Sequence, residues 1–379
     1  YKYKAMSKIL LKILTNMLLL ISVFILPSFY PAGPAVYFRL FLLTVILILS
    51  VNLFKVLFID RNIPKIIANT ATVCMAVFVT FIVLEAAFMF IPRSHSADYT
   101  LASKLWYAKY WKPINSMGFR DKEPAKSNHV ILFVGDSFTA GHGLKSADER
   151  FSDIVAKKLN KKKNDFTVMN IAKPNLDSRE EYDTMMHVLY LNRIKPEKII
   201  LQYCGNDIEG AAARHGLIFE GFKPPSDMNR FLLLVGSGSY FFNYVYFLFP
   251  REYLGIPYLT YLDTAYKNNK VLSDHKKDLM LFIDYARKNS IQIIAVVFPS
   301  LADLAMSDAM YVNDITGFLE SNGINVINVS SLTANMPIPE RIVNKNDGHA
   351  SAKVNRMVAV EILKIMDGQN ESHSSLSER

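Results

Sequence analysis

Residues suited to acyl transfer follow apolar runs of the kind that form buried strands. A serine stands in Gly135-Asp136-Ser137, directly after the run Val130–Val134, and a helix is expected to begin behind it. A turn of this kind exposes a hydroxyl and presents backbone N–H groups to an anion. The same residues could simply cap a helix. They are not the Gly-x-Ser-x-Gly elbow of the α/β-hydrolases, because Thr139 stands where that motif has its second glycine.

An amide and an imidazole occupy comparable positions later in the chain. Asn206 follows the apolar run Ile199–Cys204, and His349 comes two residues after Asp347, just before the last predicted helix. The Asn206 amide could donate to a developing oxyanion, or it could form an Asx turn. His349 could act as a general base oriented by Asp347, although a lone histidine is more often structural.

The elements that must position these residues alternate in type. The predicted strands are 130–134, 166–171, 199–204, 291–298 and 324–329, and the predicted helices are 147–159, 178–191, 274–288, 308–321 and 351–366. Alternation at this spacing predicts an α/β domain with a parallel five-stranded sheet covered by helices on both faces. Ligands of open parallel sheets bind at the carboxyl ends of the strands, so we expect Ser137, Asn206 and His349 to converge there.

The order Ser, Asn, Asp-His resembles the SGNH hydrolase superfamily, also called the GDSL esterases, over about residues 128–367. This resemblance implies a three-layer α/β/α, flavodoxin-like fold. It also implies that Ser137 is the nucleophile, His349 the base and Asp347 the acid. The backbone N–H of Ser137 and the side chain of Asn206 would then hold the oxyanion.

Two positions depart from the pattern of that family. The family has a glycine five residues after the asparagine at position 170, and this chain has Asn175 there. Asparagine also carries an N–H and tolerates a left-handed backbone, so Asn175 is kept as a third oxyanion donor. The family's acid commonly lies three residues before the histidine, which is Asn346 here; we assign the acid to Asp347 instead. The segment Asn115–Arg120 looks like the lead-in of membrane-anchored members, and we expect no catalytic role for it. His142, just behind the serine turn, is expected to be structural.

Three apolar runs before residue 92 predict membrane-spanning helices, at about 9–29, 40–58 and 66–91. Each is close to or above the roughly 20 residues that cross a bilayer core. Basic residues set the orientation, because they favour the cytoplasmic side. They gather at the N-terminus and around the second short loop: Lys2, Lys4, Lys8, Lys12, Lys55, Arg61 and Lys65. We therefore expect a multi-pass protein of the cytoplasmic (inner) membrane, with everything after Pro92 outside the cytoplasm.

Three further segments and one acidic residue carry expectations of their own. Residues 93–127 are expected to be a linker, 208–272 a lid-like aromatic insertion in the catalytic domain, and 368–379 a disordered tail. Glu85 lies near the outer end of the third run, where it could reach lipid headgroups.

Composition narrows the function classes. The formal charge is +9, but basic residues are interspersed with acidic ones, and the densest run, 157–163, suits a helix end. We therefore expect no nucleic-acid partner. No metal-ligand spacing or dinucleotide motif is present, so no metal or cofactor is expected. The two cysteines, Cys74 and Cys204, are not expected to pair.

These observations predict a serine esterase acting on O-acyl or O-acetyl groups of extracytoplasmic glycans or lipids. The alternatives are an O-acyltransferase of envelope polysaccharide that uses the same site, and a non-catalytic, membrane-tethered glycan- or lipid-binding module. The expected partners are an acylated glycan or lipid, membrane lipids and, for a transferase, a membrane protein that supplies the acyl group.

Overall fold

The computed structural model describes residues 13–18, 21, 34–59, 63–125, 129–162, 166–223, 226 and 229–377. The chain divides into two compact units, and both are assembled from segments distant in sequence. Unit 1 consists of Tyr1–Arg93, Asp98–Lys109 and Asp227–Leu248, and unit 2 of Ser94–Ala97, Tyr110–Ser226 and Phe249–Arg379.

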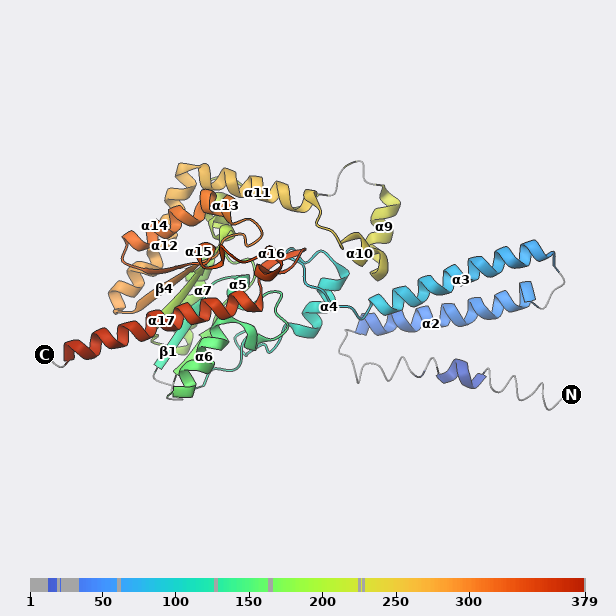
Figure 1. Ribbon diagram of the computed structural model, residues 1–379, viewed down its shortest axis with the longest axis horizontal. Coiled ribbons are helices and arrows are strands. Elements are labelled where there is room, and N and C mark those ends of the chain that lie inside the picture. The colour runs from blue at the N-terminus through green and yellow to red at the C-terminus, as the bar shows by residue number, and fades with distance from the viewer. Residues whose placement is uncertain are drawn as a thin grey trace. The chain divides into compact units, whose positions relative to one another are not determined.

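Unit 2 is built on a parallel five-stranded sheet with the strand order β2-β1-β3-β4-β5, which confirms the predicted α/β class (Figure 1). This is the flavodoxin-like order of doubly wound sheets. Its strands are β1 His129–Val134, β2 Phe166–Asn170, β3 Lys198–Tyr203, β4 Gln292–Val297 and β5 Asn325–Asn328. In β1, β3 and β4 every residue after the first is buried, as expected where helices cover both faces.

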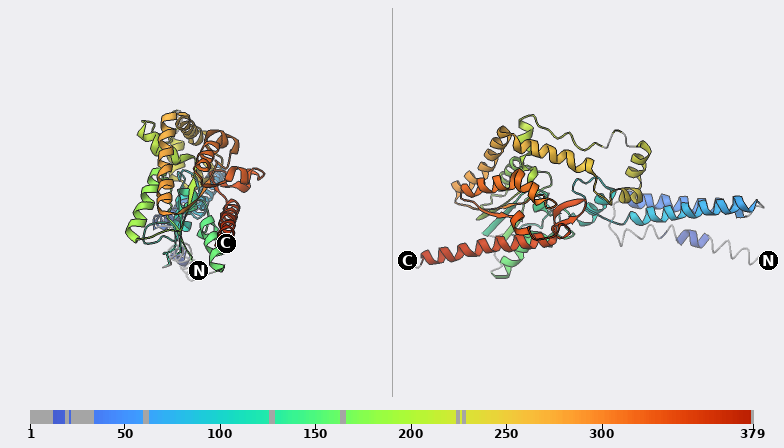
Figure 2. Two further views of the ribbon diagram at one scale, coloured as in Figure 1. Left: turned by 90° about the vertical axis from the view of Figure 1, so that its left-hand side faces the viewer. Right: turned by 45° about the horizontal axis from the view of Figure 1, so that its top comes forward.

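Helices cover both faces of the sheet. Helices α6 (Phe151–Lys162) and α17 (Ala352–Ser377) pack on one face, where the core includes Ile131, Phe133, Ile294 and Val296. Helices α7 (Ser178–Asn192), α12 (Asn269–Asn289) and α14 (Asn313–Ser321) pack on the other face, with α8 (Glu209–Arg214) and α11 (Glu252–Lys267) (Figures 1 and 2). Successive residues of β4 thus face opposite layers.

Short elements connect these layers at the loops. They are α5 Ser137–Ala140, η3 Ala147–Glu149, η4 Gly205–Ile208, α13 Leu304–Ser307, η5 Asp308–Val312, α15 Val329–Thr333, α16 Ile338–Arg341, β6 Ile342–Asn344 and β7 Asp347–Ala350. Strands β6 and β7 form a separate antiparallel pair.

Unit 1 contains two helices long and apolar enough to cross a bilayer, over Ala35–Ile59 and Lys65–Phe88. They comprise α2 (Pro34–Phe54) with the π-helical turn η2 (Lys55–Ile59), and α3 (Lys65–Phe88), which pack side by side (Figure 1). Hardly any residue of their most apolar stretches is buried, whereas a core helix of a soluble protein would be mostly buried. The expected span at 9–29 lies mostly outside the described residues. Unit 1 also contains α4 (Leu101–Tyr110), α9 (Arg230–Gly238) and α10 (Tyr240–Tyr246).

Three segments differ from expectation. Residues 93–127 do not form a separate linker: residues 98–109 belong to unit 1, and 110–127 join unit 2. The 208–272 insertion is divided, because 227–248 belongs to unit 1 and packs through α10 on α3. Helix α17 continues to Ser377 through the tail expected to be disordered; that tail contains no proline to stop it. Glu85, expected near headgroups, is buried and bound to Arg39 and the start of α10.

Candidate active site

The nucleophile candidate lies at the turn from β1 into α5. Asp136 caps α5 by accepting the Phe138 N–H at 3.0 Å, and α5 ends at Gly141, whose φ is +74°. A Cβ at Gly135 would come within 2.4 Å of the Gln202 and Thr139 side chains. Only glycine fits there, so this close packing sets the turn that presents Ser137.

The base and the acid candidates lie on one short strand, β7. Because alternate residues of a strand share a face, the two-residue spacing puts Asp347 and His349 side by side. His349 Nδ1 lies 2.6 Å from Asp347 Oδ1, and the same oxygen accepts the His349 backbone N–H at 3.2 Å. The neighbouring Gly348 N–H donates to the hydroxyl of Ser96 at 2.9 Å, which anchors the strand.

The serine and the histidine meet. His349 Nε2 lies 2.8 Å from Ser137 Oγ, and both residues are less than a tenth exposed. The ring of Phe138 packs 4.9 Å from the His349 ring, centroid to centroid. The chain Ser137–His349–Asp347 therefore has the connectivity by which a general base activates a serine.

The electrostatics of Asp347 suit the orienting role. Burial raises the pKa of this carboxyl, but the charge and hydrogen bond of His349, with contributions from His142 and Ser94, outweigh it and leave the pKa below the ordinary value. Asp347 is thus ionised at neutral pH and can stabilise an imidazolium on His349.

His142 is a buried neighbour of this pair. Its ring lies 4.4 Å from the His349 ring, and its Nε2 lies 3.6 Å from Asp347 Oδ2. Burial, followed by the charge of His349, lowers the pKa of His142 to about 3, so the side chain is neutral. Ligand atoms of His142, Asp347 and His349 lie within 4.8 Å of one another. Both His349 ring nitrogens are engaged by Ser137 and Asp347, which fits a catalytic triad better than a metal site.

Asn206 lies at the same site but is held by Asp136. Its Nδ2 donates to Asp136 Oδ2 at 3.0 Å, and the same oxygen lies 3.3 Å from the Cys204 sulfur and 3.2 Å from Ser137 Oγ, whose single proton is given to His349 in the catalytic arrangement. An amide nitrogen has two hydrogens, so one remains for an oxyanion. Asp136 thereby links the serine and the asparagine.

Asn175 has the backbone conformation expected from its place in the motif. Its φ is +64°, the left-handed region that glycine occupies most readily and asparagine tolerates. No hydrogen bond among the described residues fixes the direction of its N–H, and its role as an oxyanion donor stays a prediction.

A buried acid lies behind the Asn206 turn. Asp207 accepts the Cys204 N–H and, at 3.1 Å, the Ser178 hydroxyl. Burial and then the charge of Asp136 raise its pKa well above the usual range.

The segment before the domain, for which no catalytic role was expected, packs against the serine turn. The buried Arg120 guanidinium donates to the carbonyls of Gly141, Ala140 (3.3 Å) and Leu144 (2.9 Å), and stacks 4.9 Å from the Trp111 ring. Nothing in the sequence predicted this contact except the presence of the segment Met117-Gly118-Phe119-Arg120 itself.

A second support, also missed, lies under the Asn206 turn. His275 Nε2 lies 2.9 Å from the Tyr203 hydroxyl, which lies 2.6 Å from that of Tyr266. Tyr266 in turn donates to the carbonyl of Gly205 at 3.0 Å. This buried chain fixes the residue that precedes Asn206.

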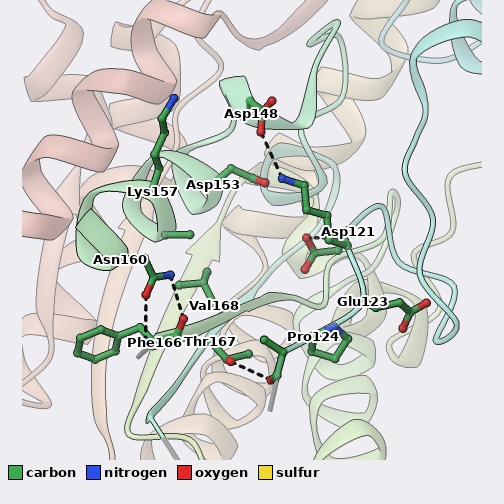
Figure 3. A pocket seen from close by; sticks show the side chains of 13 residues that line it. Asp121, Glu123, Pro124, Asp148, Asp153, Lys157, Asn160, Phe166, Thr167 and Val168 are labelled. Carbon is green, nitrogen blue, oxygen red and sulfur yellow. Dashed lines mark hydrogen bonds and ion pairs between the residues drawn. The ribbon is translucent and has the colours of Figure 1, made fainter. Parts of the chain in front are cut away.

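A cavity in the described part of the chain lies away from this site. It has a volume of about 440 Å³ and is lined by 121–125, η3, α6 and β2, with Asp148, Asp153 and Lys157 around it (Figure 3). None of Ser137, Asn206 or His349 lines it. The chemistry of the site therefore gives no reason to place a substrate there.

The chain matches no protein-family model and no curated protein. It is similar in structure to TesA (12% identity, TM-score 0.39, covering 62% of this chain and 97% of that one). It is also similar to the acetyl xylan esterase AlAXEase (14% identity, TM-score 0.39, covering 62% of this chain and 98% of that one). A third similar structure is a lipase/acylhydrolase from Enterococcus faecalis (13% identity, TM-score 0.39, covering 64% of this chain and 96% of that one).

Proposed function

We propose that this chain is a membrane-anchored serine esterase of the SGNH type, acting on O-acyl groups, O-acetyl above all, of extracytoplasmic glycans or lipids. The observation that carries the proposal is the 2.8 Å contact between Ser137 Oγ and His349 Nε2, with Asp347 on the far side of the ring. A serine hydroxyl is a weak nucleophile until an adjacent base can take its proton.

In the first half-reaction, Ser137 Oγ attacks the ester carbonyl carbon while its proton moves to His349 Nε2. The carbonyl oxygen gains the negative charge and accepts from the Ser137 N–H, the Asn206 amide and the Asn175 N–H. When the tetrahedral intermediate collapses, the C–O bond to the alcohol breaks. His349 then gives its proton to the leaving oxygen, and the acyl group stays on Ser137 as an ester.

In the second half-reaction, His349 takes a proton from water, and the resulting oxygen nucleophile attacks the acyl carbon. The carboxylic acid leaves, and the proton returns to Ser137 Oγ. A sugar hydroxyl in place of water would give O-acyl transfer by the same steps. The acyl-enzyme is the branch point between these two activities.

The two departures from the family pattern, which would suit the alternative of a non-catalytic module, each have a physical explanation. The shortened Asp347–His349 spacing suits a strand, in which alternate residues share a face, and the carboxylate contacts the imidazole directly. Asn175 adopts the left-handed backbone for which a glycine would otherwise be needed.

The anchoring part of the proposal rests on α2 and α3, whose apolar side chains are exposed along most of their length. Exposed apolar helices of about this length are stable in lipid, not in water. The basic residues Lys55 and Lys65 flank the turn between these helices and favour its placement in the cytoplasm, which puts the catalytic unit outside.

The test uses the full chain in detergent with p-nitrophenyl acetate, with and without an oligosaccharide acceptor. We expect hydrolysis by the wild type, and a loss of about 10³-fold or more in Ser137→Ala. Ser146→Ala, at an exposed serine, is the matched control and keeps its activity. An acetylated acceptor in the mass spectrum identifies a transferase, and full activity in Ser137→Ala refutes the proposal.

A further inference from the structure

The segment 231–248 of unit 1 carries no charged side chain over 18 consecutive residues. It forms nearly all of the two short helices α9 and α10, and we call residues 231–248 the uncharged hairpin. Arg230 precedes the uncharged stretch, and Arg251 follows it closely. Such a stretch is unusual between two parts of a globular domain.

The hairpin is fixed to the last turns of α3 by Glu85. The Glu85 carboxylate accepts the Ser239 hydroxyl at 2.6 Å and the N–H groups of Tyr240 at 3.0 Å and Phe241 at 3.1 Å. Arg39 completes this arrangement with an ion pair at 2.6 Å. A carboxylate in an apolar helix thus has its charge paired and its oxygens hydrogen-bonded, as burial requires.

Aromatic packing extends this attachment. Phe88 lies 5.3 Å from Phe241 and 4.9 Å from Tyr244, ring centroid to ring centroid, and Phe81 lies 5.3 Å from Phe242. Within the hairpin, the Asn243 side chain donates to the Gly236 carbonyl at 2.8 Å, which joins α10 to α9. The hairpin is therefore held at the level of the final turns of α3.

Other apolar side chains of the hairpin are uncovered. No residue of α9 is buried, and Phe231, Leu232 and Leu234 are 68%, 63% and 70% exposed. Val245 on α10 and Leu248 just after it are about two-fifths exposed. This surface belongs to the same compact unit as the exposed apolar faces of α2 and α3.

We infer that the uncharged hairpin docks into lipid: its occupant is the acyl-chain and headgroup boundary of the bilayer that α2 and α3 cross. A lipid boundary fits because the surface offers apolar area with no charge to complement, on the same compact unit as the apolar faces of α2 and α3. The nine residues of α9 span only about 13 Å, far less than a bilayer core, so the hairpin enters one interface and does not cross. This inference rests on the anchoring part of the proposed function.

Spin labels in the full-length protein test it in vesicles of phosphatidylethanolamine and phosphatidylglycerol. Labels are placed by Leu232→Cys or Leu234→Cys in a Cys74→Ser background. The remaining cysteine, Cys204, is buried, and the Cys74→Ser protein without an added cysteine measures any labelling of Cys204. The native Cys74, exposed on α3, is the lipid reference. Ile218→Cys, exposed on unit 2, is the matched apolar control in water.

Relaxation by oxygen is compared with relaxation by a water-soluble nickel chelate. We expect labels at 232 and 234 to favour oxygen, as Cys74 does, and the label at 218 to favour nickel. Nickel access at 232 and 234 overturns the inference, and so does protection from both reagents, which would mean a protein partner or a second copy covers the hairpin.

The controls separate this inference from the proposed function. Nickel access at Cys74 as well would show that the anchoring itself is wrong, and the hairpin inference would fall with it. Hydrolysis of p-nitrophenyl acetate by each labelled protein reports the active site independently, because none of the labelled positions belongs to it.

Discussion

The imidazole Nε2 of His349 lies 2.8 Å from the Oγ of Ser137, although 212 positions separate the two residues in the chain. The two side chains come from different structural contexts, a turn after strand β1 and an antiparallel strand pair late in the chain. A hydrogen bond of this length in a site less than a tenth exposed is ready for proton transfer without rearrangement.

Replacing Asp347 tests how this imidazole is oriented. In Asp347→Asn the amide can donate where the carboxylate accepts, so the ring is held in the wrong tautomer and its cation loses its partner. We expect kcat for p-nitrophenyl acetate to fall by about 10⁴-fold, with a smaller effect on KM. Asn346→Ala is the matched control. A greater loss of activity there than in Asp347→Asn would show that Asn346, and not Asp347, orients the imidazole.

Replacing Arg120 tests the support beneath the serine turn. Lysine keeps the charge but cannot bond several carbonyls in one plane, so Arg120→Lys should lower the free energy of unfolding by about 2–3 kcal/mol and reduce kcat. Arg179→Lys, in an exposed ion pair with Asp183, should change stability by less than about 0.5 kcal/mol. Urea unfolding followed by tryptophan fluorescence measures both, and equal effects in the two variants would contradict the account.

Asn175 is expected to act through its backbone, and glycine tests this. Asn175→Gly keeps the N–H and adopts a positive φ readily, so we expect activity within about twofold of the wild type. Asn175→Ala also keeps the N–H but loses the short polar side chain through which asparagine tolerates this conformation, at a cost of up to about 1 kcal/mol, so activity and stability should fall. A Gly variant as inactive as Ser137→Ala would show that the asparagine side chain itself is needed.

Acid should destabilise the protein through its buried histidines. Burial, followed by the charges of Arg214 and Lys276, lowers the pKa of His275 to about 3. Between about pH 6.5 and 3 the unfolded chain therefore binds one more proton at this residue than the folded chain. The free energy of unfolding falls as the pH falls through this window, by about 1.4 kcal/mol per pH unit. Urea unfolding at several pH values should show a shallower fall in His275→Gln, and identical slopes would contradict the assignment.

The sequence predicted the parallel sheet and the meeting of Ser137 with His349, because strand ends of a parallel sheet share one edge and the motif residues follow strands or precede a helix. It also placed Asp347 next to His349, because the side chains of residues two apart on one strand point to the same face. The direction of the Asn175 N–H could not be predicted, because it depends on the path of a loop, and a loop has no periodic sequence pattern.

Other features could not be predicted because they depend on which distant surfaces meet. The aromatic residues 241–247 are compatible with a lid or with a membrane surface, and their packing on α3 became apparent only from Phe81, Phe88 and Glu85. Arg120 likewise stood in a segment without catalytic signal. Its role comes from carbonyls that a sequence does not place.

The most direct test of the central claim is active-site labelling by a fluorophosphonate, which reacts only with an activated serine. The full-length protein is incubated with the probe, digested and analysed by mass spectrometry, beside the variants Ser137→Ala and His349→Ala. The account predicts one adduct, on Ser137, absent from Ser137→Ala and formed far more slowly in His349→Ala. An unlabelled Ser137 in the folded wild type, or equal labelling without the histidine, would contradict it.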